Sequence, residues 1–281
     1  MIFRKFIYSL ALLTFSLPSF ALPRHDPVPG GIAVIPLNDV EPSARVYFNK
    51  KRVAIVSDQD QSYALVGIPL RTKPGKKTIT VKRADGQQEK MAFDVNDKTY
   101  KAQYLTIKNK RKVNPNADDM KRITAERVKK RTARTHWSEQ PVRSDFIIPV
   151  HGRISSIFGL RRFFNNQPRN PHSGLDIAAP EGTPIKAVEA GTVLEASNFF
   201  FSGNVVYIDH GQGLISMYAH MHSMDVKPGD RVERGQVIGT VGQTGRVTGA
   251  HLHLGLIANQ TLVDPVLFLP PLDGLSDRGT P

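Results

Sequence analysis

The residues best suited to chemistry are histidines and one aspartate that occur in three short motifs: His172-Ser-Gly-Leu-Asp176, Tyr218-Ala-His220-Met-His222 and His251-Leu-His253. Side chains alternate along a strand, so His251 and His253 would share one face. On extended chain, His172 and Asp176 would share a face as well. Two such pairs on neighbouring strands would bring three imidazoles and a carboxylate to one point. A catalytic zinc ion uses three protein ligands of this kind.

Each motif also has an ordinary structural interpretation. An isolated pair of histidines two residues apart is more often a solvent-facing pair or part of a core than a metal site, and the spacing of His172 and Asp176 is common by chance. The occurrence of the pairs together within about 80 residues, with Gly174 between two of the candidates, favours the metal site. Because the chain has no cysteine, the ligands must come from His, Asp or Glu.

The sequence around these motifs resembles the lysostaphin-type, or LytM-type, family of zinc peptidases that act on peptidoglycan. The similarity covers about residues 146–268 and is carried by segments 154–161, 171–193, 203–221, 226–256 and 263–265. The resemblance implies an antiparallel β peptidase domain, one Zn²⁺ per chain and hydrolysis of an amide in the stem peptides or cross-bridges of peptidoglycan.

The resemblance also implies a division of labour among the candidate residues. His172, Asp176 and His253 would hold the zinc, and His220 and His251 would be the catalytic pair that is not bound to metal. This division is chemically reasonable, because an unliganded imidazole can take a proton from water and pass one to the leaving amine. The second imidazole can donate a hydrogen bond to the developing oxyanion.

Three further residues have two interpretations each. His222 follows His220 at the strand alternation and could reach the same face, although the family motif asks for one histidine there. His210, in Asp209-His-Gly211, fits a structural role in a turn and also has a counterpart in the family. Arg161 could meet a substrate carboxylate or form a structural salt bridge.

The elements that must position these residues are short strands. Residues 145–269 contain Gly-rich stretches of strand character and almost no helical periodicity, which predicts a β domain followed by a tail, residues 270–281. This domain is the antiparallel β peptidase domain that the resemblance implies. Residues 22–107 alternate short strands with turns such as Lys73-Pro-Gly75, which predicts a small β-sandwich-like accessory domain. The predicted fold class is therefore mainly β.

A basic linker, residues 108–144, is predicted between the two domains. Its first part, residues 108–135, holds eleven Lys and Arg against three acidic residues. Asn116 could cap a helix that has Asp118 and Asp119 in its first turn. The apolar face of this helix is thin, with Met120, Ile123 and Val128. A solvated linker helix is one interpretation, and an electrostatic contact with an anionic wall or membrane surface is the other.

The N-terminus and the distribution of charge indicate the compartment. Residues 1–21 have a basic start, an apolar run and small residues near the end, which predicts a cleavable signal peptide, with a membrane anchor as the alternative. Residues 22–144 hold 26 Lys and Arg against 13 acidic residues, whereas residues 145–281 hold 10 against 12. For a secreted protein we expect no nucleic-acid partner. The periplasm is the expected location, and the extracellular space is the alternative.

Two alternatives to catalysis follow from the same sequence. Some relatives keep the fold, lose ligands and activate other wall hydrolases, and a wall-binding protein could function through residues 22–144. All five motif residues are present here, which favours an enzyme. Among bonds, we expect the D-alanyl to diaminopimelate link rather than a glycine bridge. The sequence does not distinguish whether the N-terminal half inhibits, targets or recruits, nor does it define protein partners or oligomeric state.

Overall fold

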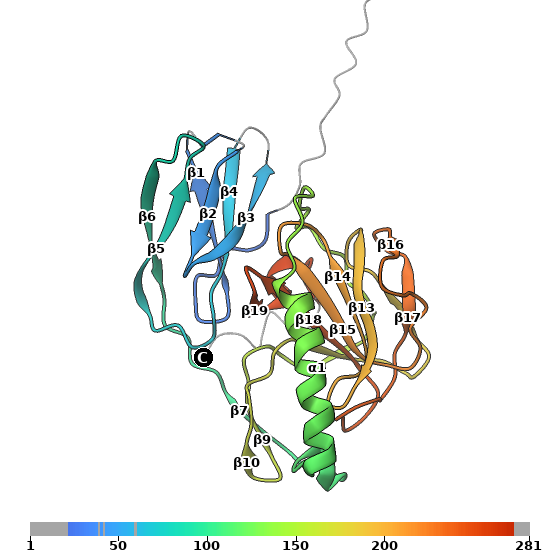
Figure 1. Ribbon diagram of the computed structural model, residues 1–281. Helices are drawn as coiled ribbons and strands as arrows, with labels where there is room; N and C mark the ends of the chain where they lie inside the picture. The colour runs from blue at the N-terminus through green and yellow to red at the C-terminus, as the bar shows by residue number, and fades with distance from the viewer. Residues whose placement is uncertain (1–21, 39, 42, 59–60, 273–281) are drawn as a thin grey trace, which may run out of the picture.

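The computed structural model describes residues 22–272, except 39, 42, 59 and 60. The predicted signal peptide, residues 1–21, and residues 273–281 of the predicted tail lie outside that part. The described chain is mainly β with one α-helix, which confirms the predicted fold class (Figure 1). Among the described residues, no helix has the length and apolar character needed to cross a membrane.

The N-terminal half forms a six-stranded antiparallel sheet. Its spatial order is β1 (Ile32–Leu37), β4 (Gln61–Gly67), β3 (Lys51–Asp58), β2 (Arg45–Phe48), β5 (Gly75–Lys82) and β6 (Gln88–Val95). Alternate residues point inward, as in β5, where Ile79 and Val81 are fully buried. Ile35 of β1 and Ile79 of β5 belong to the same core although their strands lie far apart in the order. The sheet therefore folds over itself in a sandwich-like arrangement.

The C-terminal half is built on a larger antiparallel sheet. The spatial order is β16 (Arg231–Val232), β13 (Gly191–Phe199), β14 (Gly203–Asp209), β15 (Ile215–Met221), β18 (Leu252–Ala258), β11 (Leu175–Ala178) and β8 (Arg153–Ser156), and β19 (Thr261–Val263) pairs with β18. A separate two-stranded sheet joins β12 (Pro184–Lys186) to β17 (Val237–Thr240), and a 3₁₀ turn, η2, spans Pro265–Phe268. The predicted antiparallel β architecture is confirmed.

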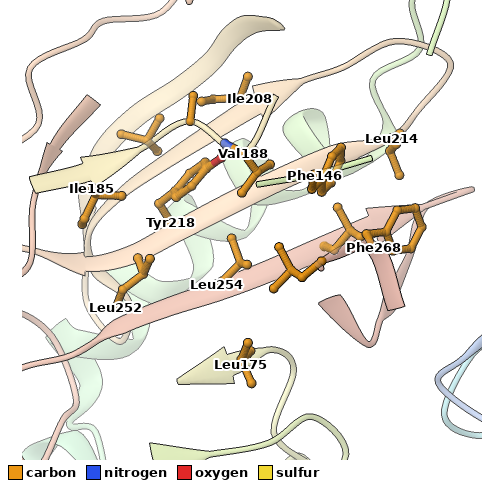
Figure 2. Close-up of a cluster of buried hydrophobic side chains, with 14 of the residues drawn as sticks. Phe146, Leu175, Ile185, Val188, Ile208, Leu214, Tyr218, Leu252, Leu254 and Phe268 are labelled. Carbon is orange, nitrogen blue, oxygen red and sulfur yellow. Dashed lines mark hydrogen bonds between the residues drawn. The ribbon is translucent and has the colours of Figure 1, made fainter. Parts of the chain in front are cut away.

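One face of the larger sheet carries the main core, which Figure 2 shows around Tyr218. Tyr218 is completely buried, and its hydroxyl accepts a hydrogen bond from Val188 N at 2.8 Å. The opposite face has its own apolar cluster, which includes Tyr207 and Ile215. Helix α1 (Ala117–Thr135) lies across this second face and contributes Ala133 to the cluster (Figure 1).

Helix α1 begins where the sequence predicted. The Asn116 side chain accepts from Asp119 N, and the Asp119 carboxylate accepts from Asn116 N, so the two residues form a capping box. A 3₁₀ turn, η1 (Lys110–Lys112), precedes it. Of the thin apolar face, only Ile123 is buried. Polar contacts fix the helix instead, because the buried Glu126 carboxylate accepts from Phe200 N at 2.8 Å. The helix is thus docked rather than simply solvated.

A three-stranded sheet links the two halves. Strand β7 (Ala102–Leu105) pairs in parallel with β9 (Arg161–Phe164), and β9 pairs with β10 (Gln167–Pro168). The sequence pattern grouped the residues of β7 with the accessory strands, but the backbone of β7 pairs with the free edge of β9. Just before β7, the Tyr100 ring packs on Gly159, where a Cβ atom would lie 2.1 Å from the ring. This contact holds the linking segment, residues 100–105, which lies between the two halves, directly beside the chain that leads to His172.

Candidate metal centre

The three predicted metal ligands converge at the pairing of β11 with β18. The antiparallel register sets Asp176 directly opposite His253, and His172 lies just before β11. Asp176 Oδ1 is 2.9 Å from His172 Nε2 and 2.7 Å from His253 Nδ1. The two ring nitrogens are 3.1 Å apart. All three side chains are buried, and they offer one ligand atom each within a 4.8 Å cluster.

Gly174 makes this convergence possible. A Cβ atom at this position would lie 2.2 Å from Leu254 O and 2.8 Å from His253 Nε2, both closer than real contacts allow. A specific steric constraint therefore requires glycine at this position between His172 and Asp176.

The protonation of the cluster suits a cation. His172 Nδ1 lies 2.7 Å from Ile157 O, which can only accept, so Nδ1 carries the proton and Nε2 turns its lone pair toward Asp176. Burial lowers the pKa of His172 to about 4. Burial alone would raise the pKa of Asp176, but His172 and His253 outweigh it and hold that pKa well below its usual value. Neutral imidazole nitrogens and a carboxylate oxygen are the donors that zinc prefers.

A second set of residues holds the ligands in place. Arg162 Nη2 donates to Asp176 Oδ2 at 2.8 Å, and Ser156 Oγ lies 3.1 Å from His172 Nδ1. Gln103 Oε1 accepts from Arg162 Nε at 3.1 Å and from Ser156 Oγ at 3.3 Å. Such partners of metal ligands fix ring orientation and raise metal affinity. Because Gln103 lies on β7, the segment between the halves is part of this support.

The sequence analysis did not identify these supporting residues. Arg162 stands next to Arg161, and Ser156 lies in the 154–161 segment that carried the resemblance, so both had a signal. Gln103 had none, because only the parallel pairing of β7 with β9 brings it to the site.

His220 and His251 lie together beside the ligand cluster. Their ring centroids are 4.9 Å apart, and His251 Nε2 is 3.8 Å from Asp176 Oδ1. His220 Nδ1 donates to Thr244 O at 2.8 Å, and His251 Nδ1 donates to Gly249 O at 2.9 Å. Each ring therefore keeps an unprotonated Nε2. Burial, followed by the neighbouring histidines, sets the pKa of His220 well below its usual value, and burial also lowers the pKa of His251.

The three residues with open roles occupy different surroundings. His222 is exposed, and its Nδ1 lies 2.7 Å from Glu181 Oε1. His210 is buried and bonds a backbone carbonyl and the Ser216 hydroxyl, and burial lowers its pKa to about 4. Arg161 Nε donates to a backbone carbonyl of the linking segment. The salt bridge considered for Arg161 is made by its neighbour, Arg162.

Comparison with known proteins identifies the family. Residues 170–265 match peptidase family M23, and residues 25–98 match the peptidase family M23 N-terminal domain. The crystal structure of a putative peptidase M23 from Pseudomonas aeruginosa is 39% identical, with a TM-score of 0.71, over 86% of this chain and 94% of that one. The chain belongs to peptidase family M23. The resemblance drawn from the sequence is confirmed.

Curated relatives of this M23 chain carry more specific names. The peptidoglycan DD-endopeptidase ShyC of Vibrio cholerae is 42% identical over 128 residues, which are 45% of this chain and 30% of the relative. The DD-carboxypeptidase/endopeptidase Mpg of Neisseria meningitidis is 39% identical over 127 residues, which are 45% and 29%. The chain therefore spans less than a third of the length of these two relatives.

Proposed function

We propose that this M23 chain is a zinc-dependent endopeptidase that hydrolyses peptide cross-links of peptidoglycan in the periplasm. One observation carries the proposal: two imidazoles and a carboxylate converge on one point, with two further imidazoles beside them whose Nε2 atoms are free of protons. The names of the curated relatives support the choice of substrate.

His172, Asp176 and His253 would hold the ion. When bound, zinc supplies Lewis-acid polarisation of an amide carbonyl and makes a water molecule more acidic. The chain's own contribution is to keep His251 and His220 neutral at physiological pH, so that either ring can accept a proton at Nε2. A ring that has accepted this proton becomes a donor, which can stabilise an anionic oxygen or protonate the departing amine.

The names of the relatives support a finer choice of bond. ShyC is named a DD-endopeptidase and Mpg a DD-carboxypeptidase/endopeptidase. Both names favour the D-alanyl to diaminopimelate link over a glycine bridge. A regulator without activity is the rival function. The complete set of ligands and of proton-transfer residues favours catalysis, because a regulator would be free to lose either.

The test is digestion of isolated sacculi by the chain 22–281, with and without a chelator, and identification of the released muropeptides by mass. We expect cleaved cross-links that disappear with the chelator and return with zinc. Asp176→Ala should lose both zinc and activity, and His251→Gln should keep zinc but lose activity. His222→Gln, two residues from His220, is the matched control and should remain active. Zinc-loaded protein that releases no product would refute the proposal.

A further inference from the structure

A pocket of about 360 Å³ lies where the two halves and the linker meet. It is bordered by α1, by the start of β3 and by the turn between β18 and β19. Five of its seven lining residues are cationic and none is acidic; the cations are Lys51, Arg127, Lys130, Arg131 and Arg134. Five of the 26 Lys and Arg residues of the segment 22–144 thus surround one hollow.

The four cations that α1 contributes to the pocket lie on one face of the helix. Arg127, Lys130, Arg131 and Arg134 follow the i, i+3, i+4, i+7 spacing that forms one stripe on a helix. Lys51 comes from the N-terminal sheet to face them, and its Nζ donates to Gln260 O at 3.3 Å. Side chains from all three parts of the chain therefore meet around the same space.

The carboxylates that the structure describes neutralise little of this charge. In the part that the structure describes, no carboxylate lies within 4.0 Å of the charged nitrogens of Lys51, Arg127, Arg131 or Arg134. Lys130 lies 3.7 Å from Glu126, but that carboxylate already binds Arg122 at 2.7 Å and Phe200 N. An anion from outside the chain could therefore balance the charge of these side chains.

The electrostatics of Lys51 agree with this reading. Its pKa is lowered, first by burial and then by the positive charges of Arg134 and Arg71. Burial likewise lowers the pKa of Lys130. Like charges held together in a partly buried space repel one another, and a bound anion would reverse that repulsion.

We propose that this pocket binds a phosphate-ester group, with Arg127, Arg131 and Arg134 as its main ligands. Guanidinium groups match the oxygens of phosphate in paired hydrogen bonds, and three of them on one stripe favour phosphate over a single carboxylate. The phosphate can come from a soluble ester or from the headgroup of an anionic lipid. The site narrows the expected contact with an anionic surface to named residues, and it does not depend on the peptidase activity.

The experiment uses the chain 22–281 in two arms. Glycerol 3-phosphate is titrated by calorimetry, and vesicles of phosphatidylcholine with and without phosphatidylglycerol are tested by co-sedimentation. The pocket variant is Arg127→Gln with Arg131→Gln and Arg134→Gln. The matched control loses the same charge from exposed lysines of the N-terminal half, by Lys73→Gln, Lys76→Gln and Lys90→Gln. Urea unfolding checks both variants, and Arg131→Gln alone replaces the triple variant if that one does not fold.

We expect the pocket variant to bind about 10-fold more weakly or worse, because losing one charge-assisted hydrogen bond already accounts for a factor of that size. The control should bind as the unaltered chain does. Pocket-dependent binding of glycerol 3-phosphate identifies a soluble ester, and pocket-dependent binding of the anionic vesicles alone identifies a lipid headgroup. Absence of binding in both arms, or equal weakening in both variants, overturns the proposal.

Discussion

Gln103 is the residue through which the segment between the two halves reaches the metal ligands. Gln103→Ala removes the oxygen that accepts from Ser156 Oγ and from the charged Arg162. A neutral hydrogen bond contributes about 0.5–1.5 kcal/mol and one to a charged group about 1.5–3 kcal/mol, so the two bonds together contribute about 2–4.5 kcal/mol. Loss of a direct partner of a metal ligand lowers metal affinity about 10–100-fold, and we take this as the range for Gln103, which acts through two such partners, Arg162 and Ser156. That range corresponds to about 1.4–2.8 kcal/mol, and the remainder should appear as lower stability of the metal-free fold.

Competition with a chromophoric chelator measures the zinc affinity of each variant directly. Gln103→Glu keeps an accepting oxygen and should restore most of the affinity that Gln103→Ala loses. Gln88→Ala, on the exposed side of β6, is the control for loss of a glutamine. Excess zinc should return the activity of Gln103→Ala on sacculi, because the residue orients ligands and does not touch the substrate. If Gln103→Ala binds zinc as tightly as the unaltered chain, β7 only connects the two halves and does not support the metal ligands.

Three further perturbations test the packing that supports the site. Asn259→Ala removes both hydrogen bonds to Gly67, one to its N–H and one to its carbonyl. It should lower the free energy of unfolding, measured in urea, by about 1–3 kcal/mol. An unchanged unfolding midpoint would show that this contact between the halves is dispensable. Tyr218→Phe leaves the buried Val188 N–H without its acceptor and should cost about 1–3 kcal/mol, measured in the same way; a neutral result would mean that water replaces the hydroxyl. The pKa of His210 is about 4 in the folded chain and about 6.5 in the unfolded chain, so below about pH 6.5 the unfolded chain takes up a proton that the folded chain does not. The free energy of unfolding should therefore be highest above about pH 6.5 and fall by up to about 3 kcal/mol as the pH falls to about 4. His210→Gln should flatten this loss, and an equally steep pH profile in that variant would contradict the assignment.

The parts of the site that the sequence predicted are those fixed by local periodicity. Strand alternation placed His251 and His253 on one face, and the register of β11 against β18 then sets Asp176 opposite His253. The cap at Asn116 was also readable, because a capping box is a local pattern. The partners of these residues depend on pairings between distant segments, so they had no local signal. The acceptor of His220 Nδ1, Thr244 O, also comes from a distant segment and could not be predicted.

The same distinction changes how the N-terminal half is understood. An accessory domain that only targets or recruits could be removed without effect on the metal centre. Here Tyr100 packs on Gly159, Asn259 binds Gly67, and Gln103 supports two ligands. These contacts tie the N-terminal half and the linking segment to the C-terminal half: Tyr100 and Gln103 reach the chain that leads into His172, and Gly67 is bound from the turn after β18. We therefore expect a fragment that begins at residue 145 to bind zinc more weakly than the chain 22–281. Its loss of zinc affinity should be at least as large as that of Gln103→Ala. Chelator competition on the two proteins tests this, and equal affinity would restore the view of two separable domains.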